Sequence, residues 1–173
     1  MTDSKTGLAV VIGSGGGIGA AMLARLQRDA GYAQALGFSR NTEVCVDYLD
    51  EASLVAAAQW VAAQCAATGL DLRLLIVATG FLHGDQGQPE RSFNHLDAAY
   101  LQHVFAINAI GPALVMKHFL PLLPKSGRCV AGFVSAKAGL KVRPAEEAAS
   151  ACRVNSVLGS WPKQYVRKKL LNS

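Results

Sequence analysis

The amino-acid sequence predicts an α/β fold in which a parallel, doubly wound sheet is covered by helices on both faces. Two observations support this prediction. Short, continuously apolar segments alternate with longer segments of helical pattern, and strands buried on both faces of a parallel sheet have this apolar character. In addition, the first apolar segment, Leu8–Ile12, leads through a glycine cluster directly into an amphipathic helix.

Each predicted element follows from a local pattern. The strands are expected at residues 8–12, 35–38, 44–46, 72–77 and 129–134. The helices are expected at about residues 18–30, 51–68 and 97–123, with Gly69 ending the second and Pro112 marking a kink or a join in the third. Residues 81–95 are expected to form a loop. Strands that alternate with helices imply right-handed crossovers and a three-layer αβα arrangement.

The glycine cluster, Gly13-Ser14-Gly15-Gly16-Gly17-Ile18-Gly19, lies between the first strand and the first helix. In a strand–turn–helix unit the free N–H groups and the positive end of the helix dipole point at one place, which favours an anion. Glycine lets a pyrophosphate approach the backbone there. A glycine-rich hairpin or linker is the alternative, but a helical pattern begins at once and no second strand follows.

The composition restricts the class of protein. The 173 residues, of which 51% are hydrophobic, suffice for one domain with a sizeable core. Apolar runs are too short to span a bilayer, and the N-terminus lacks a charged segment followed by an apolar one. We therefore expect a cytoplasmic protein with neither a secretory signal nor a membrane partner. The scattered cysteines and histidines argue for reduced thiols and against a metal site. The net charge of +5 is expected to attract phosphate-bearing ligands, but no nucleic-acid-binding motif accompanies it.

Several motifs, taken in order, resemble those of the short-chain dehydrogenase/reductase family. Glycines 13, 17 and 19 match its G-x-x-x-G-x-G motif, although Ile12 stands where that motif usually has threonine. The segment Asn108-Ala109-Ile110-Gly111 matches its N-x-x-G motif, and Ala78-Thr79-Gly80 resembles its N-N-A-G motif without the asparagines. Order and spacing agree from residue 8 to about residue 139, so the resemblance implies a Rossmann-like domain.

The resemblance also implies a dinucleotide cofactor at the carboxyl ends of the strands. Asp47-Tyr48 resembles the family segment that contacts adenine. Arg40 follows the second strand where an acidic residue would favour NAD, so we expect NADP(H), with NAD(H) less favoured. An ordinary solvated arginine is the alternative. The expected cofactor-binding residues are Gly13, Ser14, Gly17, Ile18, Gly19, Ser39, Arg40, Asp47, Tyr48, Ala78, Gly80 and Asn108.

For catalysis, the family implies hydride transfer between nicotinamide and a small carbonyl or alcohol substrate. A tyrosine exchanges the proton, a lysine lowers its pKa, a serine binds the substrate oxygen and an asparagine holds a water. In this chain, Tyr165 is the candidate for the tyrosine and Lys169 for the lysine. Ser135 is the candidate for the serine and Asn108 for the asparagine. Each has an alternative: a serine that ends a strand, an asparagine that bonds backbone groups, and a chance Y-x-x-x-K match in a basic terminal helix.

The C-terminal part departs from the family. Residues 145–157, where the Tyr–Lys pair is expected, contain neither residue type, and Tyr165 lies 30 residues beyond Ser135. We therefore expect one domain over 1–173, with a family-like core at 8–139 and an atypical helical segment at 140–173 that lacks the last strands of the family fold through truncation or divergence. A catalytically impaired nucleotide-binding or interaction protein is the alternative function.

A homo-oligomer formed through the 97–123 helix is a further expectation from the family. Ala113, Val115, Phe119 and Leu122 are apolar residues that suit such an interface. A place in the core explains the same residues equally well.

Overall fold

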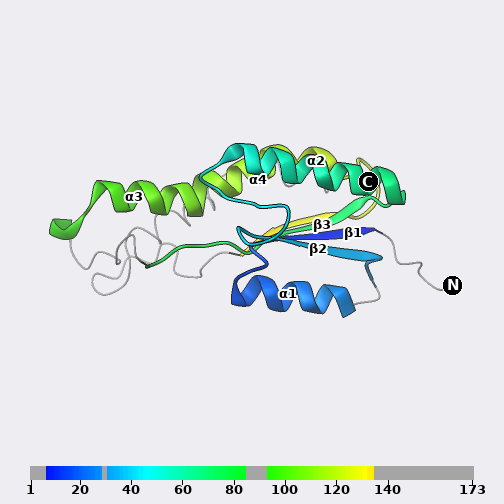
Figure 1. Cartoon of the computed structure of the whole chain (residues 1–173), viewed down its shortest axis with the longest axis horizontal. Coiled ribbons are helices and arrows are strands. Elements are labelled where there is room, and N and C mark those ends of the chain that lie inside the picture. The colour runs from blue at the N-terminus through cyan, green and yellow to red at the C-terminus, as the bar shows by residue number, and fades with distance from the viewer. Residues whose placement is uncertain (1–6, 29–30, 85–92, 135–173) are drawn as a thin grey trace.

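The computed structural model describes residues 7–28, 31–84 and 93–134. Four parallel strands form one sheet in the order β2-β1-β3-β4, with bounds Leu8–Ile12 for β1, Gln34–Phe38 for β2, Leu72–Val77 for β3 and Val130–Phe133 for β4. Helix α1 (Gly17–Arg28) covers one face, and helices α2 (Glu51–Thr68) and α4 (Gly111–Phe119) cover the other (Figure 1). The predicted α/β class is therefore confirmed.

The central strand β1 has no exposed residue, because it is paired on both edges and covered on both faces. All five of its residues have 0% exposure. In the register, Ile12 lies beside Phe38 of β2 and Val77 of β3, and Val77 lies beside Phe133 of β4. The carboxyl ends of all four strands therefore meet at one edge of the sheet.

The expected strand at residues 44–46 is not formed; this segment has no regular secondary structure. The Thr42 hydroxyl lies 2.8 Å from the carbonyl oxygens of Ser39 and Val44, and the Val46 N–H donates to the Ser39 carbonyl at 3.1 Å. These bonds fold the chain into a turn beside the end of β2. A parallel crossover needs about a dozen residues, and the link from Phe38 to Val44 is far shorter.

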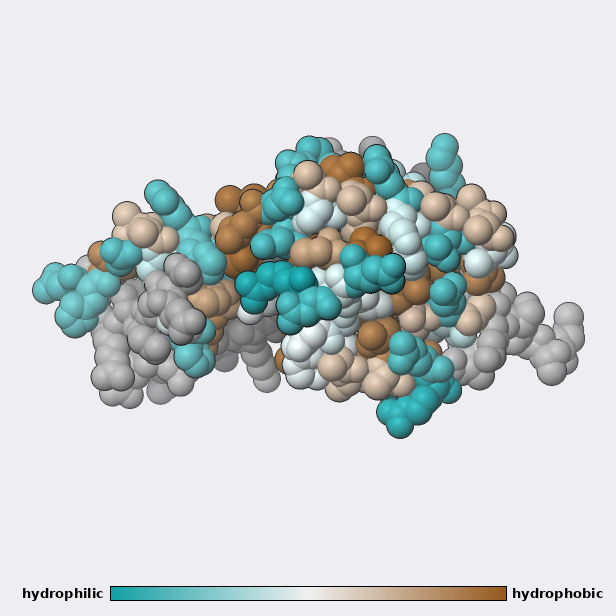
Figure 2. All heavy atoms as spheres, in the orientation of Figure 1, coloured by the Kyte–Doolittle hydropathy of each residue, from teal (hydrophilic) through white to brown (hydrophobic). Residues whose placement is uncertain are grey.

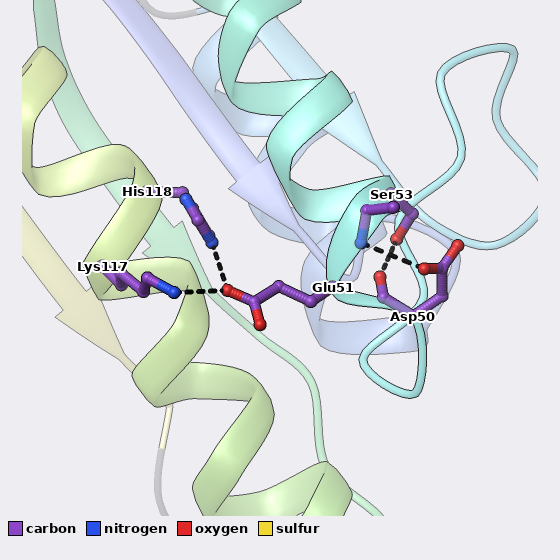
Figure 3. Close-up of polar contacts among 6 residues, drawn as sticks. Asp50, Glu51, Ser53, Lys117 and His118 are labelled. Carbon is purple, nitrogen blue, oxygen red and sulfur yellow. Dashed lines mark hydrogen bonds and ion pairs between the residues drawn. The ribbon is translucent and has the colours of Figure 1, made fainter.

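Helix α2 begins and ends with local capping. The Asp50 side chain accepts from the Ala52 N–H at 3.0 Å, and Gly69 takes a left-handed φ of 68° at the C-cap. Figure 3 shows how the next residue, Glu51, reaches α4: its Oε1 lies 2.7 Å from Lys117 Nζ and 2.7 Å from His118 Nε2. These contacts hold the N-terminus of α2 against the last turn of α4.

The expected long helix at 97–123 consists of several helical pieces. Helix α3 (Ala98–Phe105) continues into a π-helical turn, η2 (Ala106–Ile110), then into α4 and a 3-10 turn, η3 (Leu120–Leu122). Gly111 and Pro112 form the start of α4, so Pro112 marks a join, as predicted. In Figure 1, α3 projects beyond the edge of the sheet, whereas α4 lies over it.

The continuous tract Ala98–Leu122 is long and apolar enough to cross a membrane by length and composition, a property that counting uninterrupted apolar runs did not reveal. Length and composition alone are weak evidence for a membrane-spanning helix, since the core helix of a soluble protein passes the same test. Val115 and Phe119 are 0% exposed and belong to the core that α4 shares with the sheet. In Figure 2 the helical layer above the sheet presents hydrophilic and hydrophobic residues side by side.

Candidate functional site

The candidate site lies at the edge of the sheet where the four strands end. Gly13 follows β1, Ser39 follows β2, Ala78 follows β3 and Val134 follows β4. The Ala78 N–H donates to the Ile12 carbonyl and the Val134 N–H to the Val77 carbonyl, both at 2.8 Å, so the pairing extends to this edge. Ligands of open α/β sheets bind at this position.

The turn after β1 requires glycine at two of its positions, because a side chain there would collide with the backbone. Gly13 has a φ of +91°, and a Cβ there would lie 2.8 Å from the Ala78 carbonyl oxygen and 2.8 Å from Thr79 Cγ2. A Cβ on Gly19 would lie 2.1 Å from the Gly13 carbonyl oxygen. By contrast, a Cβ on Gly17 would have nothing within 4 Å. Glycines 13 and 19 are thus needed to form the turn, whereas Gly17 leaves open space above it.

Several backbone N–H groups of this turn have no acceptor. Gly13 and Ser14 donate to the Phe38 carbonyl, and Gly16 and Ala20 donate within the turn. In the described part of the chain, the N–H groups of Gly15, Gly17, Ile18 and Gly19 make no hydrogen bond. Because α1 begins at Gly17, its positive dipole end adds to these donors. The arrangement suits an anion with several oxygen acceptors, as a pyrophosphate has.

The turn after β2 presents Arg40 to solvent. The Ser39 Oγ accepts from the Asn41 N–H at 3.2 Å, and the Ser39 N–H donates to Thr42 Oγ1 at 2.9 Å. These bonds fix the backbone on which Arg40 sits. Arg40 is exposed and, among the described residues, has no ion-pair partner, so its guanidinium group is available to an anionic ligand.

Asp47 and Tyr48 form a turn in front of α2. One Asp47 carboxylate oxygen accepts from the Leu49 N–H at 2.9 Å, and the Asp47 N–H lies 2.9 Å from Ser53 Oγ. Tyr48 is only 7% exposed, and burial raises its pKa well above the usual range. Among the described residues, the second Asp47 carboxylate oxygen has no hydrogen-bond partner, whereas the Tyr48 side chain is buried.

The structure adds three residues that were not among the expected site residues, although two of them, Thr79 and Gly111, lie within the quoted motifs. The Thr79 hydroxyl lies 2.8 Å from that of Tyr48. A Cβ on Gly111 would lie 2.0 Å from Tyr48 Cδ2, and one on Gly37 would lie 2.4 Å from Leu23 Cδ2, so both glycines permit close packing. Gly37 carries a sequence signal, since a glycine within an apolar strand indicates a close approach. The Tyr48–Thr79 contact joins residues 31 apart and has no local signal.

Asn108 lies in the π-helical turn and clamps the loop after β3. Its Oδ1 accepts from the Phe81 N–H at 2.8 Å, and its Nδ2 donates to the Phe81 carbonyl at 2.7 Å. The amide thus bonds backbone groups, as one of the two interpretations of this residue expected, although they belong to the β3 loop rather than to its own helix. A Cβ on Gly80 would lie 3.7 Å from Asn108 Oδ1, so the clamp lies beside the candidate site.

The remaining catalytic candidates, Ser135, Tyr165 and Lys169, lie outside the described residues. The described chain ends at Val134, whose N–H pairs with β3 at the site edge.

No protein-family model and no curated protein sequence matches this chain. Solved structures do match it. The putative carbonyl reductase Sniffer of Caenorhabditis elegans is 17% identical with a TM-score of 0.79, over 95% of this chain and 80% of that one. The ligand-free aldohexose dehydrogenase of Thermoplasma acidophilum is 14% identical with a TM-score of 0.73, over 96% and 63%.

A carbonyl reductase from chicken fatty liver, solved with NADPH bound, is 20% identical with a TM-score of 0.57, over 69% of this chain and 49% of that one. Other matches are described as short-chain dehydrogenases, with TM-scores of 0.72 and 0.73. This chain therefore spans less than two thirds of the aldohexose dehydrogenase and about half of the chicken enzyme. At such identities the likeness establishes a shared fold, and it confirms the fold that the motifs implied.

Proposed function

We propose that this chain, which has the fold of the short-chain dehydrogenases and reductases, binds a nicotinamide dinucleotide and transfers hydride between it and a carbonyl or alcohol substrate. The observation that supports binding most strongly is the group of N–H donors at Gly15, Gly17, Ile18 and Gly19, which have no acceptor among the residues that the structure describes. They lie at the sheet edge beside the open space over Gly17. A pyrophosphate fits this combination of donors, helix dipole and missing side chains.

The preferred form of the cofactor is NADP(H). Arg40 is exposed after β2, where a guanidinium group pairs with a 2′-phosphate. Calorimetric titration with NADPH and NADH tests this preference. We expect Arg40→Gln to weaken NADPH binding about tenfold and to change NADH binding little. Arg25→Gln is the matched control, because it removes the same charge from the exposed side of α1. Tighter binding of NADH by the unmodified chain contradicts the assignment.

A bound nicotinamide would supply the hydride, and the chain would supply the proton and hold the substrate. We assign the substrate oxygen to Ser135, the proton to Tyr165 and the tuning charge to Lys169. The i,i+4 spacing of the last two is the spacing that a helix would need to bring them to one face. Asn108 supports the site by holding the loop after β3. The test is oxidation of NADPH with a panel of aldehydes and ketones, comparing the unmodified chain with Ser135→Ala and Tyr165→Phe. Each variant should lose at least about 100-fold in kcat.

A nucleotide-binding protein without turnover is the second candidate function. The observation that favours it is the absence of Tyr and Lys at residues 145–157, where the family places its catalytic pair. Its signature is saturable NADPH binding without oxidation of NADPH by any carbonyl in the panel. The same titration and panel therefore distinguish the two functions.

A homo-oligomer in the cytoplasm remains part of the proposal. Of the apolar residues considered for the interface, Val115 and Phe119 are in the core. Ile110, at the end of the π-helical turn, is 53% exposed and is available to a second copy. Sedimentation of the unmodified chain and of Ile110→Ser measures this association.

A further inference from the structure

The hydroxyl groups of Tyr48 and Thr79 lie in contact beside the glycine turn. The sequence analysis did not assign a hydroxyl-donating role to either residue. The Thr79 and Tyr48 oxygens are 2.8 Å apart. The Thr79 methyl group lies against Gly13, because a Cβ on that glycine would be 2.8 Å from Thr79 Cγ2. Thr79 therefore lies between the buried tyrosine and the turn that presents the unpaired N–H groups.

The two hydroxyl groups together carry one proton more than their mutual hydrogen bond uses. Each hydroxyl carries one proton, and a single hydrogen bond between the two oxygens uses one of them. Among the described residues, no other partner of either hydroxyl is present. Tyr48 is 7% exposed, whereas Thr79 is only partly buried. The oxygen positions allow either hydroxyl to donate. If Thr79 donates, the spare proton is left on the buried Tyr48, and a buried unpaired donor is costly. With a ligand bound, the orientation that leaves no donor unpaired has Tyr48 donating to Thr79, with the spare proton on Thr79.

We propose that Thr79 is a nucleotide-binding residue, whose hydroxyl donates to an oxygen of the ribose–phosphate chain of the dinucleotide. The proposal rests on the proposed function, since it concerns the same ligand. Tyr48 is then a positioning residue, which does not contact the ligand but orients the Thr79 hydroxyl towards it.

Packing and the neighbouring turn fix the position of Tyr48, as a positioning role requires. Its ring lies against the α-carbon of Gly111 at the start of α4, and its backbone follows the Asp47 turn. The tyrosine thus joins the Asp47 turn, the end of β3 and the start of α4, three segments that surround the site. Because burial raises its pKa, the phenol keeps its proton throughout the neutral range and can always donate to Thr79.

Fluorescence titration of NADPH against the full chain tests the proposal, with five variants. Thr79→Val removes the hydroxyl and keeps the shape, and we expect NADPH to bind about fivefold more weakly. Thr79→Ser keeps the hydroxyl and should bind within about twofold of the unmodified chain. Tyr48→Phe should also weaken binding, and the double variant should bind no more weakly than Thr79→Val alone, because the tyrosine acts through the threonine. Thr68→Val, which removes an exposed hydroxyl at the far end of α2, should have no effect.

Thermal unfolding without nucleotide identifies any variant that fails to fold. Thr79→Ala then replaces Thr79→Val, since it removes the hydroxyl without a branched side chain, and the same fivefold loss is expected. The proposal is overturned when the hydroxyl-free variants bind NADPH as the unmodified chain does, or when Thr79→Ser loses as much as Thr79→Val. If the unmodified chain itself binds no NADPH, the proposed function fails and this inference fails with it. Normal binding by all variants refutes the inference alone.

Discussion

Replacing Gly19 by alanine tests the geometry of the glycine turn. The added Cβ would lie 2.1 Å from the Gly13 carbonyl oxygen and 2.7 Å from its carbon, whereas real Cβ contacts keep at least 3.0 Å. The helix start and the turn must therefore separate by about 0.9 Å, and both are backbone. Overpacking of this kind costs about 1–3 kcal/mol, and alanine returns at most about 1 kcal/mol of helix propensity. We expect a net loss of about 1–2 kcal/mol in the free energy of unfolding.

Gly17→Ala is the matched control for this measurement. Its Cβ meets nothing within 4 Å, so urea unfolding without nucleotide should show unchanged or slightly increased stability. The same Cβ fills the open space over the turn, so NADPH binding should weaken even though the fold is intact. If Gly19→Ala is as stable as Gly17→Ala, the tight contact between the turn and the helix start does not exist.

Three further variants test the packing around the site. Gly111→Ala places a Cβ 2.0 Å from the Tyr48 ring, and should lower the free energy of unfolding by about 1–3 kcal/mol in urea. Glu51→Gln removes a carboxylate whose pKa is held below its usual 4.5 by its two basic partners on α4. The stability from this lowered pKa is present above the unfolded value and lost as the pH falls through the folded one. The variant should therefore be less stable than the unmodified chain at pH 7, and the difference should disappear as the pH falls below the folded pKa of Glu51. Asn108→Ala leaves both Phe81 backbone groups without their partner, and should cost about 1–3 kcal/mol and speed amide hydrogen exchange at Phe81.

Local sequence patterns predicted the elements whose formation depends on local properties. The apolar run at 72–77 became β3 with the predicted bounds, and Gly69 ended α2 as a glycine C-cap does. The same reasoning failed at residues 44–46, where three apolar residues resembled a strand. The decisive fact there was the length of the connection from β2, which is too short for a parallel crossover.

Contacts between segments that are far apart in the sequence could not be predicted from the sequence. The π-helical turn before Gly111 accompanies the packing of Tyr48 against that glycine, which depends on a residue far away in sequence. The Asn108 clamp on Phe81 and the Tyr48–Thr79 contact are of the same kind. The resemblance to the family's motifs located these residues, but the partners of their side chains are set by the tertiary fold.

The most direct test is nuclear magnetic resonance of the ¹⁵N-labelled chain during titration with NADPH. A dinucleotide held by the turn should shift the amide signals of Gly15, Gly17, Ile18 and Gly19 together, with one saturable binding curve, because these N–H groups gain acceptors. If those four signals stay in place at millimolar NADPH while the spectrum remains that of a folded protein, the turn does not bind a pyrophosphate.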